Sequence, residues 1–167
     1  SCDPTAGDFP LTKEMYGLAV DMKVADFAKI TCIPANAFAE YEGNVTLGNM
    51  PLLVSVGDKA FFNFKGTLKI QADSLRLEAI GDFAFSMPLK NYLDDPSSFD
   101  HETFIELTSV DQLRSIGTGA FSGDMFRLTL SGNCPQLQGI GARAFINVCQ
   151  RGPLGEAVRK LPGNADL

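Results

Sequence analysis

The side chains best able to do chemistry gather in one acidic stretch between residues 88 and 103. His101 is the only histidine of the chain, and four carboxylates stand near it: Asp94, Asp95, Asp100 and Glu102. Carboxylates can hold Ca²⁺, but this spacing does not follow the EF-hand loop, with its regularly spaced acids and central glycine. Adjacent acids such as Asp94 and Asp95 need not face each other as an acid–base pair. We predict a solvated acidic loop here.

No catalytic motif accompanies this histidine. The sequence has no Gly-x-Ser-x-Gly, no P-loop and no dinucleotide-binding fingerprint in a strand-to-helix setting. Glycine-rich triplets such as Gly139-Ile140-Gly141 belong to a repeated turn described below. We therefore predict that the protein is not an enzyme, and no residue pattern calls for a metal or a cofactor.

The overall charge limits the class of partner. The 167 residues include 14 Lys and Arg against 20 Asp and Glu, a formal net charge of −6. An acidic surface argues against nucleic acid and anionic membrane as partners. No apolar run approaches the ~18 residues that a membrane-spanning helix needs. A protein is therefore the expected partner.

The four cysteines lie in two pairs near the ends of the chain. This distribution suggests the disulfides Cys2–Cys32 and Cys134–Cys149, which belong to an oxidising compartment. Four buried free thiols, which behave as small hydrophobic groups, are the alternative.

Two further features bear on the compartment. The triplet Asn44-Val45-Thr46 is an N-glycosylation sequon, which matters only in a eukaryotic secretory pathway. The chain begins with Ser1 and not with Met, which favours removal of a targeting segment. We expect an extracellular location or an organelle lumen or periplasm, and a cytoplasmic location stays open.

The strongest signal is an internal repeat. A branched apolar residue, here called the anchor, is followed four and five residues later by Ala-Phe. The anchors are Ile33, Val56, Ile80, Ile116 and Ile140, and the phenylalanines are Phe38, Phe61, Phe85, Phe121 and Phe145. The steps between these phenylalanines are 23, 24, 36 and 24 residues, so the long step is one repeat plus a 12-residue insertion. A fixed period of this length predicts a solenoid whose small units stack to bury a shared core.

An alternating apolar pair precedes each of the last four anchors. These pairs are Val45/Leu47, Leu68/Ile70, Ile105/Leu107 and Leu128/Leu130. Residues i and i+2 of a strand share one face, so each pair predicts a short strand with both side chains inward. Strands one repeat apart then form a parallel sheet, and the repeated phenylalanines form an interior column.

This pattern resembles the BspA-like class of leucine-rich repeats, which is marked by Leu-x-x-Ile-Gly-x-x-Ala-Phe at the centre of a unit of about 23 residues. The matching stretches are Leu53–Phe61, Leu77–Phe85, Leu113–Phe121 and Leu137–Phe145, and Ile30–Phe38 is a degenerate copy with Pro34 in place of the glycine. The resemblance implies an α/β-type repeat solenoid: a short right-handed coil with a parallel β-sheet on its concave face and few or short helices. It also implies a role in binding or adhesion, with no catalytic residues.

The repeat sets the expected organisation of the chain. Residues 20–148 form a solenoid of about five units with an insertion at about 88–103. Residues 1–19 form an N-terminal cap, because a terminal unit must cover its apolar side. Residues 149–167 form a C-terminal cap or a docking tail.

The same alternation predicts which side chains point outward from the sheet. Its central outward row is Thr46, Lys69, Glu106 and Thr129, so Lys69 and Glu106 would be cross-strand neighbours. Phe104 and Arg127 fall in a flanking row and are candidates for binding hot spots, because aromatic residues and Arg dominate interface energies. Phe104 folded under the insertion is the alternative. The insertion adds the partner-binding candidates Tyr92, Asp94, Asp95, Phe99 and Asp100.

Two functions fit these features. The first is a recognition or adhesion module that binds a protein through the concave face and the acidic insertion. The second is a small structural or accessory subunit of a larger complex on the lumenal or periplasmic side of a membrane.

Overall fold

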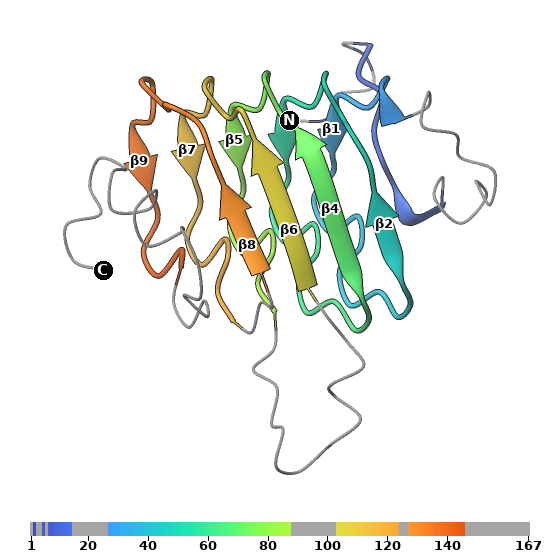
Figure 1. Ribbon diagram of the computed structural model, residues 1–167. Coiled ribbons are helices and arrows are strands. Elements are labelled where there is room, and N and C mark those ends of the chain that lie inside the picture. The colour runs from blue at the N-terminus through green and yellow to red at the C-terminus, as the bar shows by residue number, and fades with distance from the viewer. Residues whose placement is uncertain are drawn as a thin grey trace.

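The computed structural model of the chain describes Cys2, Thr5 and residues 7–14, 27–87, 103–123 and 127–145. The described residues form two parallel sheets of short strands and almost no helix (Figure 1). The first sheet has the order β1-β3-β5-β7-β9, and the second has the order β2-β4-β6-β8. In Figure 1 the second sheet lies in front of the first. The chain visits the two sheets alternately, which is the topology of a β-repeat solenoid.

The strands of the second sheet carry the alternating pairs. They are β2 (Val45–Leu47), β4 (Leu68–Asp73), β6 (Thr103–Thr108) and β8 (Arg127–Leu130). In β4 the apolar side chains of Leu68 and Ile70 are buried, whereas Lys69 and Gln71, which alternate with them along the strand, are exposed. The predicted inward side chains of all four strands are buried, so this part of the prediction is confirmed.

The first sheet was not predicted. It is built from β1 (Cys32–Ile33), β3 (Ser55–Val56), β5 (Ala79–Ile80), β7 (Ser115–Ile116) and β9 (Gly139–Ile140). Each of these two-residue strands ends on an anchor, and the anchors pair with one another from coil to coil. The sequence indicated a turn after each anchor but did not indicate that the anchor ends a short β-strand. Two residues are too few to show the alternating pattern of a strand.

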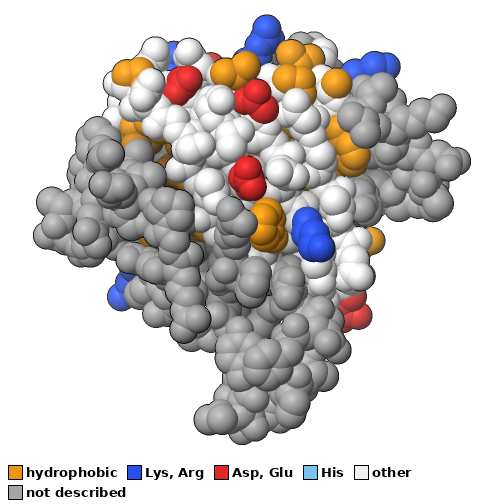
Figure 2. All heavy atoms as spheres, in the orientation of Figure 1, with side chains coloured by type: hydrophobic (Ala, Val, Ile, Leu, Met, Phe, Trp, Pro, Cys, Tyr) orange, Lys and Arg blue, Asp and Glu red, His pale blue; other side chains and the backbone are white. Residues whose placement is uncertain are grey.

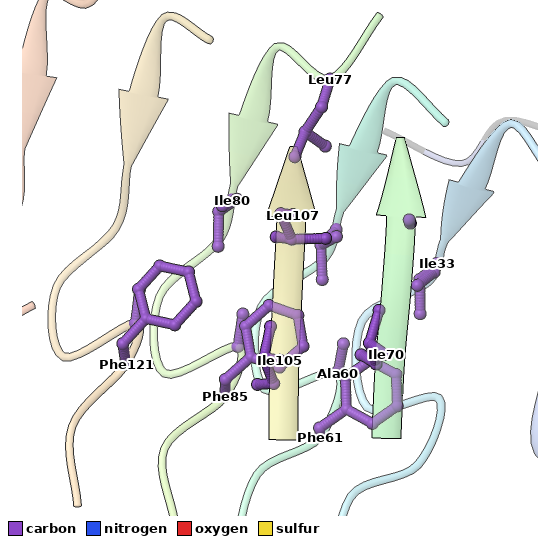
Figure 3. Close-up of a cluster of buried hydrophobic side chains, with 14 of the residues drawn as sticks. Ile33, Ala60, Phe61, Ile70, Leu77, Ile80, Phe85, Ile105, Leu107 and Phe121 are labelled. Atoms are coloured by element: carbon purple, nitrogen blue, oxygen red, sulfur yellow. The ribbon is translucent and has the colours of Figure 1, made fainter. Parts of the chain in front are cut away.

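The repeated phenylalanines form the predicted interior column. Phe61 and Phe85 are parallel to within 8°, with ring centroids 5.1 Å apart. The other three steps have centroid distances of 5.1, 5.3 and 5.4 Å and interplanar angles of 2°, 8° and 7°. All five rings are at most 5 % exposed. Figure 3 shows Phe61, Phe85 and Phe121 in a row across successive coils, near anchors such as Ile80 and inward residues of the second sheet such as Ile105.

The backbone of each Ala-Phe pair holds neighbouring coils together. The amide of Phe61 donates to the carbonyl of Ala84 at 2.7 Å, and the amide of Phe85 donates to the carbonyl of Ala120 at 2.7 Å. The same bond recurs from Phe38 and Phe121. One sequence position therefore provides both a stacked ring and a bond between coils.

The position after the anchor requires glycine because the preceding coil leaves no room for a side chain there. At Gly117 a β-carbon would lie 2.5 Å from the backbone nitrogen of Asp82 in the preceding coil. Gly57, Gly81 and Gly141 are equally crowded by the backbone of the coil before them. Pro34 occupies this position in the first repeat of the series, where residues 9–11 and not another repeat lie beside the strand.

Residues 9–11 run alongside β1. Pro10 bridges to Cys32 in parallel, and the amide of Leu11 donates to the carbonyl of Cys32 at 2.9 Å. Leu11 is fully buried. The disulfide between Cys2 and Cys32 ties the start of the chain to the same strand, as predicted. The N-terminal residues therefore cover the outer edge of the first sheet, and the predicted tail at 149–167 lies outside the described residues.

Candidate functional site

The outward side of the second sheet carries the partner-binding candidates that the sequence placed on the repeat units. It presents mostly uncharged polar side chains and backbone, with single charges set apart from one another (Figure 2). The outward residues of β2 and β4, Thr46, Lys69 and Gln71, are exposed. Those of β6, Phe104 and Glu106, are partly buried.

The register between β4 and β6 differs from the predicted rows, whereas the pairs between β2 and β4 and between β6 and β8 agree with them. Lys69 pairs with Phe104, and Gln71 pairs with Glu106. The expected neighbours Lys69 and Glu106 are therefore two residues out of register, and no ion pair joins them among the described residues. The one ion pair found there joins Lys65 and Glu42 at 3.7 Å, and both side chains are well exposed.

The cause of this shift is Thr103. It pairs with Leu68 and is buried at 3 % exposure, so it occupies an inward position that the apolar pattern had given to Ile105. At the other end of the strands Leu107 pairs with Ala72, which is also buried. A shift of two residues leaves every side chain on its predicted face but changes every neighbour.

The observed register places Lys69 in the same row as Phe104 and Arg127, two candidates that the sequence had already put side by side. The row now reads Thr46, Lys69, Phe104 and Arg127. Phe104 stands between two cationic residues in neighbouring strands, and Arg127 is placed here by its backbone register alone. We call Lys69, Gln71, Phe104, Glu106 and the backbone position of Arg127 the recognition face.

The candidates in the insertion lie outside the described residues. These are Tyr92, Asp94, Asp95, Phe99 and Asp100, together with His101 and Glu102. The insertion lies between β5 and β6 in the chain, and Thr103 after it is the first residue of β6. Within the described part of the chain, no group of three or more His, Cys, Asp or Glu side chains could hold a metal ion.

Asx side chains fasten successive coils to one another. The amide of Asp82 donates to Oδ1 of Asp58, and the amide of Thr118 donates to Oδ1 of Asp82, both at 2.8 Å. Asn49 accepts in the same way from the amide of Asp73 at 2.9 Å. Asn49 lies seven residues before its anchor Val56, and this bond joins its coil to the next one. Asp58 and Asp82, two residues after their anchors, form a ladder that the sequence analysis missed.

A groove of about 760 Å³ runs along the outer side of the first sheet. It is lined mainly by small residues, among them Ser55, Ala79 and Ser115, with Asp58 and Asp82 at its rim. The carboxylates of the rim are already used in the Asx ladder. The groove is thus a shallow surface between coils that carries no cluster of reactive groups.

The second predicted disulfide is not formed in the structure. Cys134 is a free thiol at 3 % exposure and donates to the carbonyl of Val110 at 3.3 Å. Burial raises the pKa of the Cys134 thiol, and the nearby Asp111 carboxylate raises that pKa further. Its intended partner, Cys149, lies outside the described residues. Cys134 packs as a small apolar group, which is the alternative that the sequence had left open.

Comparison with known proteins found no similar protein. The chain matches no family model, no curated protein and no solved structure. Among the described residues, no helix is long and apolar enough to cross a membrane.

Proposed function

We propose that this protein is a non-enzymatic recognition module of the leucine-rich-repeat type, similar to the BspA-like class, and that it binds a protein partner through the recognition face. In this proposal the coil is right-handed and the second sheet forms its concave side. The repeated Leu-x-x-Ile-Gly-x-x-Ala-Phe units support the family, and the alternation of two parallel sheets agrees with it.

The observation that carries the proposal is the row of Lys69, Phe104 and Arg127 across three neighbouring strands. Aromatic residues and Arg dominate interface energies, and this row holds one of each in neighbouring strands. The sheet beneath it is held by a fully buried core, so this row needs little ordering when a partner binds. A rigid platform with few charges of its own favours a protein surface as partner.

The size of the platform limits the partner. Four strands at a spacing of about 4.8 Å span roughly 15–20 Å. That width accommodates a loop or one short segment of another protein. The proposal therefore concerns a compact contact on one partner, and the residues of the acidic insertion remain further candidates for that contact.

A comparison of two single variants tests this proposal. The natural partner is first isolated with the protein from its source by cross-linking and identified by mass spectrometry. Lys69→Ala on the recognition face should then weaken binding of that purified partner about tenfold, as expected for one hot-spot side chain. Ser115→Ala, an exposed position on the first sheet, is the matched control and should leave the affinity unchanged. Equal affinities of both variants, or loss only in Ser115→Ala, would refute the proposal.

A second function is favoured by a different observation. Among the residues that the structure describes, four large apolar side chains are exposed: Phe9, Val54, Leu75 and Phe83, at 36 to 51 %. Such groups suit a permanently covered surface in an accessory subunit of a complex. In that case the partner should co-purify at fixed stoichiometry, and Leu75→Ser should release it whereas Lys69→Ala should not.

A further inference from the structure

Asn44 begins the only Asn-x-Ser/Thr triplet of the chain, Asn44-Val45-Thr46. We propose that Asn44 is the attachment site of an N-linked oligosaccharide. The triplet alone is a frequent chance motif, so the argument depends on where the fold places it.

The strand alternation turns Asn44 outward. Asn44 directly precedes β2, in which Val45 and Leu47 are at most 1 % exposed. Asn44 and Thr46 stand on the opposite side, and both are exposed. A sugar bonded to Asn44 therefore extends away from the core and disturbs none of its packing.

The hydrogen bond that Asn44 makes in the folded protein is compatible with this modification. The amide of Thr67 in the next coil donates to Oδ1 of Asn44 at 3.1 Å. Oδ1 is thereby held toward the neighbouring coil, and Nδ2, the atom that bonds the sugar, is the other branch of the carboxamide. A glycosylated asparagine keeps its Oδ1 acceptor, so the hydrogen bond between coils is retained after modification.

The surroundings leave room for a bulky polar group. Asn44 follows Glu42, whose side chain is 78 % exposed, and the facing Lys65 side chain is 48 % exposed. β2 is also the last strand of its sheet in the order β2-β4-β6-β8. A glycan beside a terminal strand hinders edge-to-edge association, which is a hazard of any sheet that ends in a strand.

The disulfide between Cys2 and Cys32 agrees with this modification. Disulfides persist in the oxidising compartments of the secretory pathway, where N-glycosylation takes place. The two modifications therefore require the same route for the chain.

The reaction needs one co-reactant, an oligosaccharide carried on a polyprenyl pyrophosphate. Nδ2 of Asn44 attacks the anomeric carbon, and a carbon–nitrogen bond forms there. The bond from that carbon to the pyrophosphate oxygen breaks, and the lipid pyrophosphate leaves with the electron pair. One Nδ2 proton passes to a base of the transferase, which acts on the unfolded chain and recognises the Thr46 hydroxyl.

Peptide mapping of the protein from its natural source tests the proposal. Enzymatic release of N-glycans in heavy-oxygen water converts each glycosylated asparagine into labelled aspartate. We expect the peptide that contains Asn44 to carry the heavy label. A natural protein whose Asn44 is unlabelled, whether or not it is modified elsewhere, would overturn the proposal.

Matched variants assign the signal to this triplet. The full chain, secreted from a eukaryotic host, should show a mobility shift that glycan release removes. Thr46→Ser should keep this shift, and Thr46→Val should abolish it while leaving the bond from Thr67 to Asn44 in place. Thermal unfolding of Thr46→Val confirms that the variant is folded. A shift that persists in folded Thr46→Val would contradict attachment at Asn44.

Discussion

Gly81 lies so close to the preceding coil that a β-carbon at this position would stand 2.6 Å from the amide nitrogen of Asp58. The φ angle of Gly81 is not positive, so the requirement for glycine is one of space. The two coils can approach this closely because Gly81 carries only a hydrogen atom where another residue would carry a side chain.

The first prediction follows from this contact. Gly81→Ala must push two coils apart, and we expect it to lower the free energy of unfolding by about 1–3 kcal/mol. Gly139→Ala is the matched control, since a β-carbon there meets nothing within 4 Å, and its effect should stay within about 0.5 kcal/mol. Urea denaturation measures both. Equal stability of the two variants would show that the coils are not in contact at Gly81.

The Asx ladder gives a second prediction. Asp82→Ala removes the acceptor for the amide of Thr118 and should cost about 0.5–1.5 kcal/mol. Asp82→Asn keeps an Oδ1 acceptor at the same place, so its stability should remain close to that of the wild type. If Asp82→Asn is as destabilised as Asp82→Ala, the charge of Asp82 and not its hydrogen bond matters.

The third prediction concerns the register of the second sheet. Cysteines introduced together at Lys69 and Phe104 should form a disulfide under mild oxidation, because paired residues of neighbouring strands lie within bonding range. Cysteines at Lys69 and Glu106 are diagonal neighbours, about 7–8 Å apart, and should form it poorly. Peptide mapping separates the new bond from those of the native cysteines. Efficient disulfide formation between Lys69→Cys and Glu106→Cys would contradict the observed register and support the one expected from the sequence.

The reason why sequence alone did not fix this register is visible in the spacing. Ile105 lies 11 residues before its anchor, whereas Leu68 and Ile70 lie 12 and 10 residues before theirs. Ile105 is therefore one residue closer to its anchor than Leu68 is, and one residue farther from it than Ile70 is. The spacing to the anchor thus favours neither pairing over the other. The choice depends on whether Thr103 and Ala72 enter the core, and that is a property of packing and not of the apolar pattern.

Other parts of the structure were predictable for physical reasons. The Ala-Phe column could be foreseen because a residue repeated at one period must stack on its own copies, as Phe61 and Phe85 do. The disulfide between Cys2 and Cys32 could be foreseen from the position of the cysteines. Cys134 could not be assigned, since a buried thiol and a bonded one look the same in a sequence.

The fourth prediction concerns the Cys134 thiol. Its pKa is raised by burial and by Asp111, so the folded protein keeps the proton at a pH where the unfolded chain has lost it. The stability that this group contributes is therefore complete below the unfolded pKa and declines as the pH rises toward the folded pKa.

Urea denaturation across the alkaline range checks this. Both variants carry Cys149→Ser, and one of them also carries Cys134→Ala. The free energy of unfolding should fall more steeply with rising pH in the variant that retains Cys134. Asp111→Asn, which keeps an acceptor for the amide of Asn133, should lower the Cys134 pKa. Identical slopes with and without Cys134 would contradict the burial of this thiol.

The central claim is that the outward side of the second sheet binds the partner. The most direct measurement is photo-cross-linking in the native setting, with a photoreactive residue placed either at Gln71 on the recognition face or at Ser115 on the first sheet. Both positions are exposed, so both variants should fold. We predict that Gln71 yields a defined cross-linked protein and that Ser115 does not. Cross-linking of the same protein from Ser115 and not from Gln71 would contradict the claim.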